Sequence, residues 1–61
     1  MRYHFYNNRI NANKPTATMA TIRELFDYVR EAIDMRADWK ILDTRKWQQC
    51  DKKMIMEMMG K

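Results

Sequence analysis

Cys50 and His4 are the only cysteine and the only histidine, and this sets the strongest limit on how a chain of 61 residues can be stabilised. One cysteine cannot form a disulfide within the chain, and the pair cannot supply the four ligands of a structural zinc site. A domain of this size buries only about 60% of the surface that its unfolded chain exposes, so its core is small. We therefore expect stability to come from close helix packing or from association, and a homodimer is one form of that association.

The composition predicts a single folded domain over residues 1–61. Charged residues make up 33% and hydrophobic residues 46% of the chain, a balance typical of globular domains and not of disordered segments. Apolar residues nowhere form a run of about 18, so no membrane partner is expected. Seven methionines and an unpaired cysteine are open to oxidation. They fit a reducing compartment, and the sequence therefore predicts a cytoplasmic protein.

The net charge of +4 is unevenly distributed. Residues 1–20 carry three Lys/Arg residues and no acid, residues 21–35 carry a net charge of −2, and residues 36–61 carry +3. Two basic segments thus flank an acidic one. Such a distribution is compatible with a polyanionic partner, including nucleic acid.

The N-terminal segment "RYHFYNN" predicts a β-strand, because it is rich in aromatic residues and alternates in character. In a strand, Tyr3 and Phe5 would face one side, and Arg2, His4 and Tyr6 the other. The asparagine-rich segment that follows predicts a turn or loop. Asn7-Asn8 can close a hairpin, so we expect a strand or hairpin over about 2–12.

A capping box, Thr21 with Glu24, marks the start of the first predicted helix. Apolar residues then recur at helical spacing and form one continuous stripe. The stripe consists of Ile22, Leu25, Phe26, Val29 and Ile33. The pattern predicts a helix over about 18–35.

The segment after this helix has two interpretations. As a helix it would align Trp39 and Leu42 with Trp47; as a strand it would place Trp39 and Ile41 on one face. No glycine or proline interrupts residues 36–59, which favours a second helix over about 38–59, capped by Asp38. The predicted fold class is α+β, an N-terminal strand or hairpin followed by an αα-hairpin. The alternative is β-α-β-α with a short strand near 39–42.

The residue types exclude most catalytic designs. The chain has no serine and one glycine, so neither a serine triad nor a glycine-rich phosphate loop can form. Cys50 with His4 is the one conceivable nucleophilic pair, and a cysteine on an apolar stripe is usually a small buried hydrophobe. We expect no enzyme, no catalytic residue and no cofactor.

The C-terminal methionines suggest either a soft-metal site or a packing surface. On a strand, Met54, Met56 and Met58 would share one face and offer three thioethers to Cu(I). On a helix, Met54 and Met58 align with Trp47 and Cys50, and only Met56 falls outside the stripe. Helical packing also accounts for the tryptophan, so no metal site is predicted. Because methionine adapts to varied partners, the predicted partner-binding residues are Trp47, Met54, Met58 and Met59.

The N-terminal segment supplies candidate contacts to nucleic acid or to an acidic partner. Lysine and arginine can contact phosphates, and an aromatic ring can stack on a base. The candidate residues are Arg2, His4, Tyr6, Arg9 and Lys14.

These features together predict a non-catalytic small binding protein that docks on a larger protein or nucleoprotein complex and modulates or inhibits it. Accessory proteins of phages and mobile elements are often of this kind. The alternative is a dimeric basic DNA- or RNA-binding regulator that uses the N-terminal strand. In either case a lone hairpin is marginal in water, so we expect the strand to pair across a dimer or with a partner.

Overall fold

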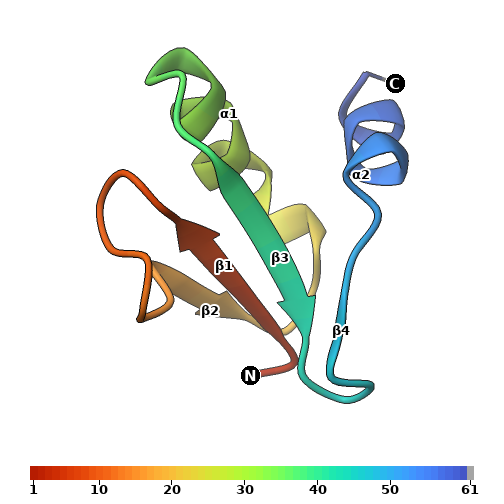
Figure 1. The fold of residues 1–61 in the computed structure, drawn as a ribbon. Coiled ribbons are helices and arrows are strands. Elements are labelled where there is room, and N and C mark those ends of the chain that lie inside the picture. Colours follow the sequence, from red (N-terminus) through yellow and green to blue (C-terminus); the bar gives the residue numbers. More distant parts are fainter. Residues whose placement is uncertain (61) are drawn as a thin grey trace.

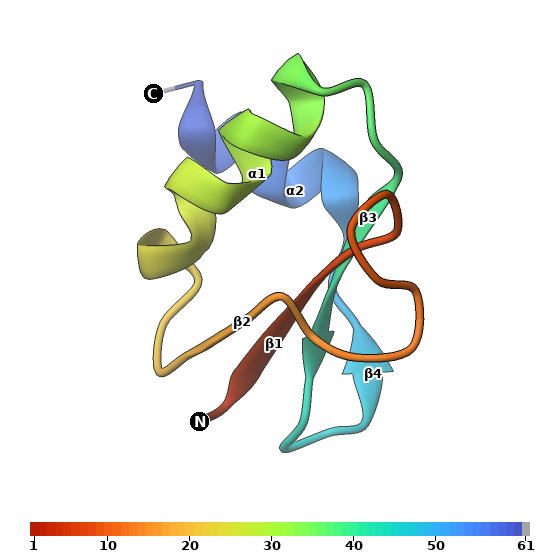
Figure 2. The same ribbon diagram turned by 90° about the vertical axis from the view of Figure 1, so that its left-hand side faces the viewer.

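The computed structural model describes residues 1–60 as a four-stranded antiparallel sheet with both α-helices on one side (Figures 1 and 2). The elements in chain order are β1 (Tyr3–Asn7), β2 (Ala17–Met19), the 3-10 helix η1 (Arg23–Leu25), α1 (Phe26–Asp34), β3 (Trp39–Asp43), β4 (Gln48–Gln49) and α2 (Lys52–Met59). The strands lie in the order β2-β1-β3-β4. The predicted strand followed by an αα-hairpin is therefore wrong, because strands are spread through the chain. The alternative, β-α-β-α with a short strand near 39–42, is right about that strand, which is β3, but it lacks β2 and β4.

The strand β1 occupies the middle of the sheet and is paired on both edges. Phe5 lies opposite Ala17 of β2 and opposite Ile41 of β3. All pairs in the sheet are antiparallel. The strand finds both of its partners within its own chain, so pairing across a dimer is not required to satisfy it.

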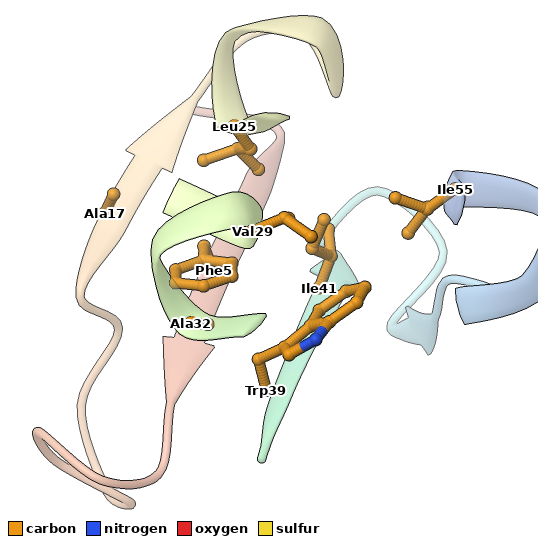
Figure 3. Packing of buried hydrophobic residues seen from close by; sticks show 8 residues of the cluster. All are labelled: Phe5, Ala17, Leu25, Val29, Ala32, Trp39, Ile41 and Ile55. Atoms are coloured by element: carbon orange, nitrogen blue, oxygen red, sulfur yellow. The ribbon is translucent and has the colours of Figure 1, made fainter. Parts of the chain in front are cut away.

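The core lies between the sheet and the helices (Figure 3). Phe5 and Ile41 point from the central strands toward Val29 of α1, while Ile55 points inward from α2. The Phe5 ring also packs against Trp39, with ring centroids 6.3 Å apart. The buried apolar side chains are Phe5, Ala17, Leu25, Val29, Ala32, Trp39, Ile41 and Ile55. The predicted alternation is confirmed within β1, because Tyr3 and Phe5 pack on this core and His4 and Tyr6 do not. Arg2, expected on the side of His4 and Tyr6, is instead hydrogen-bonded to Asp43.

Asn7 explains why the chain does not return immediately after β1. Its side-chain Oδ1 accepts the backbone N–H of Arg9 at 3.0 Å, and its carbonyl accepts the N–H groups of Ile10 and Asn11. These bonds curl the chain into a turn, and Asn11 organises a second turn by accepting two further N–H groups. The expected hairpin over about 2–12 is therefore wrong; the return strand is β2, after a loop of residues 8–16.

The first helix begins later than predicted, because residues 17–19 pair with β1. Glu24 does accept the Thr21 N–H at 3.1 Å, which is half of the predicted capping box. In the apolar stripe, Leu25 and Val29 are buried, whereas Ile33 is exposed and Ala32 takes its place in the core. The helix spans Phe26–Asp34 and ends in a Schellman motif, in which Ala37 donates its N–H to Ala32 and Arg36 donates to Ile33. Arg36 occupies the left-handed position there, with φ of 54°.

The second predicted helix, over about 38–59, is replaced by a hairpin and a short helix. Trp39 and Ile41 are buried on one face of β3, and the Cys50 N–H extends the pairing to the Ile41 carbonyl. The N-cap of α2 is Asp51, which accepts the Lys53 N–H at 2.9 Å. The expected cap, Asp38, instead forms an ion pair with Lys52, whose Nζ lies 3.0 Å from Asp38 Oδ1. The segment forms a strand and not a helix because five of its residues pair with the edge of β1.

Ile55 is the one residue of α2 that is fully buried. We expect Ile55→Val to lower the free energy of unfolding by about 0.5–1.5 kcal/mol, because it removes one methylene from a packed site. Met56→Ala on the exposed side of the same helix should stay within about 0.5 kcal/mol of the wild type. Urea denaturation followed by tryptophan fluorescence measures both. Equal losses in the two variants would show that Ile55 does not anchor the helix.

Candidate functional site

The face of the sheet opposite the helices carries a small set of side chains, which we call the open face. In the sheet register, Thr18 and Leu42 lie on either side of His4, and Lys40 lies opposite Tyr6. Since strand residues alternate between faces and Phe5 points into the core, these side chains point the other way. The open face therefore includes Thr18, His4, Tyr6, Lys40 and Leu42, with Gln49 of β4 opposite Leu42.

The open face combines aromatic and cationic character. The Lys40 ammonium group lies 5.1 Å from the centroid of the Tyr6 ring, a cation–π arrangement between the two central strands. His4, Tyr6 and Leu42 are half-buried, and Lys40 is exposed. No position of the open face is acidic, so the surface suits an anion or a stacked ring.

Arg2 is held at the end of the sheet by Asp43, away from the role predicted for it. Its Nε and Nη2 donate to the two carboxylate oxygens at 3.3 and 3.2 Å. These hydrogen bonds hold the pKa of Asp43 below its ordinary value. The same carboxylate accepts the Arg45 N–H at 3.1 Å, so it also closes the turn after β3. Arg2 and Asp43 therefore join the N-terminus to the β3–β4 hairpin.

The remaining predicted nucleic-acid contacts are dispersed. Arg9 donates from Nη1 to the Met35 carbonyl at 2.7 Å, which ties the loop to the end of α1. Lys14 is exposed in the same loop. Of the five residues, only His4 and Tyr6 lie together on the open face. Their role in binding stays a prediction.

A pocket of about 370 Å³ opens on the helix side of the sheet, between β4 and the start of α2. Apolar groups of Tyr3, Ile22, Cys50 and Met54 line it, together with the Arg2–Asp43 ion pair. Its remaining lining is polar and comes from Lys46, Gln48, Gln49 and Asp51. A concave pocket with this mixed apolar and polar lining can accept one side chain of a partner.

The methionines of α2 lie on two flanks of the helix. Met54 and Met58 are four residues apart and share one flank, with exposed fractions of 47% and 40%. Met56, at 45%, projects from the other flank, while Met59 packs against the core beside Ile55. Because Met54 also lines the pocket, the pocket and the Met54–Met58 flank are continuous.

Trp47 does not belong to a helical stripe, as the sequence suggested, because the chain turns at this residue. The turn is closed by the Lys46 N–H, which donates to the Asp43 carbonyl, and Trp47 follows it with φ of 50°. The side chain is 78% exposed. A bulky residue is unfavourable in this left-handed conformation. Because the side chain is exposed, its burial does not offset that cost. Neither packing nor turn geometry explains a tryptophan here.

The conceivable nucleophilic pair is not assembled. His4 lies on the open face, whereas Cys50 packs against the core on the helix side. Partial burial raises the pKa of the Cys50 thiol, which disfavours the reactive thiolate. Within residues 1–60, no three His, Cys, Asp or Glu side chains are grouped to hold a metal ion.

Among the helices of residues 1–60, none has the length and apolarity needed to span a bilayer. Comparison of the chain with protein-family models, with curated proteins and with solved structures gave no match. The interpretation of the site therefore depends on its geometry and chemistry.

The sequence interpretation did not assign Leu42 to a binding surface, nor Ile22 and Tyr3 to a pocket. The signal for Leu42 was the alternation in "WKILD", where Trp39, Ile41 and Asp43 are buried and the residues between them are not. No local signal marks the pocket, since its lining residues come from three stretches of the chain, 2–3, 22 and 43–54.

The ion pair of Asp43 should make stability depend on pH. Because the folded-state pKa of Asp43 is depressed, its contribution is complete above the unfolded-state pKa of about 3.9 and is lost as the pH falls through the folded-state value. We expect Asp43→Asn to lower the melting temperature at pH 7, with a smaller difference from the wild type near pH 3. Thermal melts across this range measure the effect, and Asp34→Asn on exposed α1 is the control. A difference that stays constant with pH would contradict the role of the ion pair.

The left-handed backbone at Trp47 should favour glycine. We expect Trp47→Gly to raise the free energy of unfolding by about 1 kcal/mol, because glycine has no side chain to clash at positive φ. Lys46→Gly, one residue earlier in the same turn, should not stabilise the protein. Urea denaturation compares the variants. A Trp47→Gly protein less stable than the wild type would show that the tryptophan serves the fold.

Proposed function

We propose that this chain is a non-catalytic binding protein that docks on a larger macromolecular complex and modulates or inhibits it. The observation that carries the proposal is the pocket beside the Met54–Met58 flank of α2. Exposed apolar side chains around a concave pocket are typical of protein interfaces.

The anchoring of α2 supports an interface in this place. Ile55 and Met59 hold the helix to the core, so the exposed Met54 and Met58 are not needed for its attachment. Methionine side chains are flexible and polarizable, and they adapt to apolar surfaces of different shapes. The flank can therefore pack on a partner while the helix remains in position.

Trp47 is the next residue to consider, because its neighbours in the chain line the pocket. It stands between Lys46 and Gln48, both of which line the pocket. Tryptophan is among the residues most enriched at the energetic centres of interfaces. A strained backbone conformation at an exposed residue suggests a functional role. The Trp47 side chain is not buried within the fold, but it would be buried in contact with a partner.

The docking surface can be tested with matched variants of one helix. We expect Met54→Asp combined with Met58→Asp to reduce recovery of the bound complex from the host by at least about tenfold, because a charge would be buried against an apolar partner. Met56→Asp introduces the same charge at similar exposure on the other flank and should leave recovery unchanged. Trp47→Ala should weaken binding as well. Affinity purification with quantitative mass spectrometry measures recovery, and circular dichroism verifies folding.

Equal recovery of the same proteins by the wild type and all of these variants would contradict the proposal. An equal loss with Met56→Asp would also contradict it, because the effect would then follow from charge and not from the Met54–Met58 flank.

A further inference from the structure

We propose that the open face is a second binding site, separate from the α2 surface, and that it binds single-stranded nucleic acid. The two sites lie on opposite sides of the sheet, since the pocket borders α2 and the open face points away from the core. The inference therefore goes beyond the docking function and does not depend on it.

The charge of the sheet layer fits a polyanion. Residues 1–20 and 36–49, which form the strands and their connecting loops, contain seven Lys/Arg residues against Asp38 and Asp43, a net charge of +5. Both acids are already paired, Asp43 with Arg2 and Asp38 with Lys52. Residues 21–35, which include α1, carry −2 instead. A phosphate backbone is therefore attracted to the sheet layer and repelled by α1.

The side chains of the open face indicate which form of nucleic acid fits. His4 and Tyr6 are two residues apart on β1 and place two rings in a row on a central strand. Lys40 stands beside the Tyr6 ring, where it can contact a phosphate next to a stacked base. Leu42 adds apolar surface opposite His4. Bases can stack on such rings only when they are unpaired, so the occupant is a single strand.

A duplex fits the structure less well. Major-groove recognition by a helix requires a basic or neutral helix surface, whereas α1 exposes Asp27, Glu31 and Asp34. The helix α2 has only eight residues and is attached beside the pocket. On the open face, by contrast, two aromatic rings lie beside the Lys40 ammonium group without an acid.

Fluorescence anisotropy with labelled mixed-sequence oligonucleotides tests the proposal. At about 50 mM salt, the wild type should bind a single-stranded DNA or RNA of 12 nucleotides more tightly than a duplex of equal length, with affinity falling as salt rises. The ratio of the two affinities shows whether the open face prefers DNA or RNA. Tyr6→Ala should weaken binding by about tenfold, whereas Tyr6→Phe should retain it, because stacking needs the ring and not the hydroxyl.

Two variants with the same change of charge distinguish binding at the open face from general electrostatic attraction of the oligonucleotide to a basic protein. Lys40→Glu should abolish most of the binding, and Lys53→Glu on α2 should have a much smaller effect. The Met54→Asp and Met58→Asp variants should bind the oligonucleotide normally, so failure of one proposal is distinguishable from failure of the other. Thermal melts confirm that each variant is folded.

Four results would overturn the inference. The wild type could fail to bind either single strand at about 50 mM salt, or bind the duplex equally well. The Lys40→Glu and Lys53→Glu variants could weaken binding equally. Finally, Tyr6→Ala could abolish recovery of a host protein after nuclease treatment, which would assign the open face to a protein partner.

Discussion

The pairing of β1 on both of its edges is the interaction on which the structure depends. The N-terminal strand lies between β2 and β3, and its inward residues Phe5 and Asn7 are buried. The Phe5 ring packs against Trp39 of β3 and against Tyr28 of α1. Asn7 forms the turn that leads the chain away from β1. The contact with β3 joins residues more than 30 positions apart, so two distant segments of the chain must come together before the core closes. Arg2 and Asp43 fix that closure at the end of the two strands.

This central strand separates the two surfaces for which we propose functions. Alternation along β1 sends Phe5 to the core and His4 and Tyr6 to the open face. The helices then cover only the core side, and their exposed residues form a surface with different chemistry. One surface offers methionine and a pocket, and the other offers rings and a cation. The two proposed partners would therefore contact opposite sides of the sheet.

The sequence predicted those features that depend on a few neighbouring residues and failed where pairing between distant strands decides the structure. The β1 strand and the burial of Leu25 and Val29 follow from patterns within a few residues, and both were predicted. The hairpin at β3 and β4 was not, because the segment around Trp39 carries helical and strand periodicity together and only the pairing edge of β1 decides between them. Met54 and Met58 are exposed, whereas Met59 of the same predicted set packs against the core, and the role of these residues in partner binding stays a prediction. Their alignment with Trp47 fails because that residue lies in a turn, which a chain with one glycine must build from other residues.

The lengths of the outer strands have a consequence for the behaviour of the protein at high concentration. The two five-residue strands are internal, while the edges are formed by β2 with three residues and β4 with two. Unpaired backbone at a sheet edge is a template for association with other chains, and short edges offer little of it. The apolar, aromatic segments of β1 and β3 are thus kept from self-association by their position. The strand β4 covers the outer edge of β3, and its opening would expose the edge of a five-residue strand to other chains.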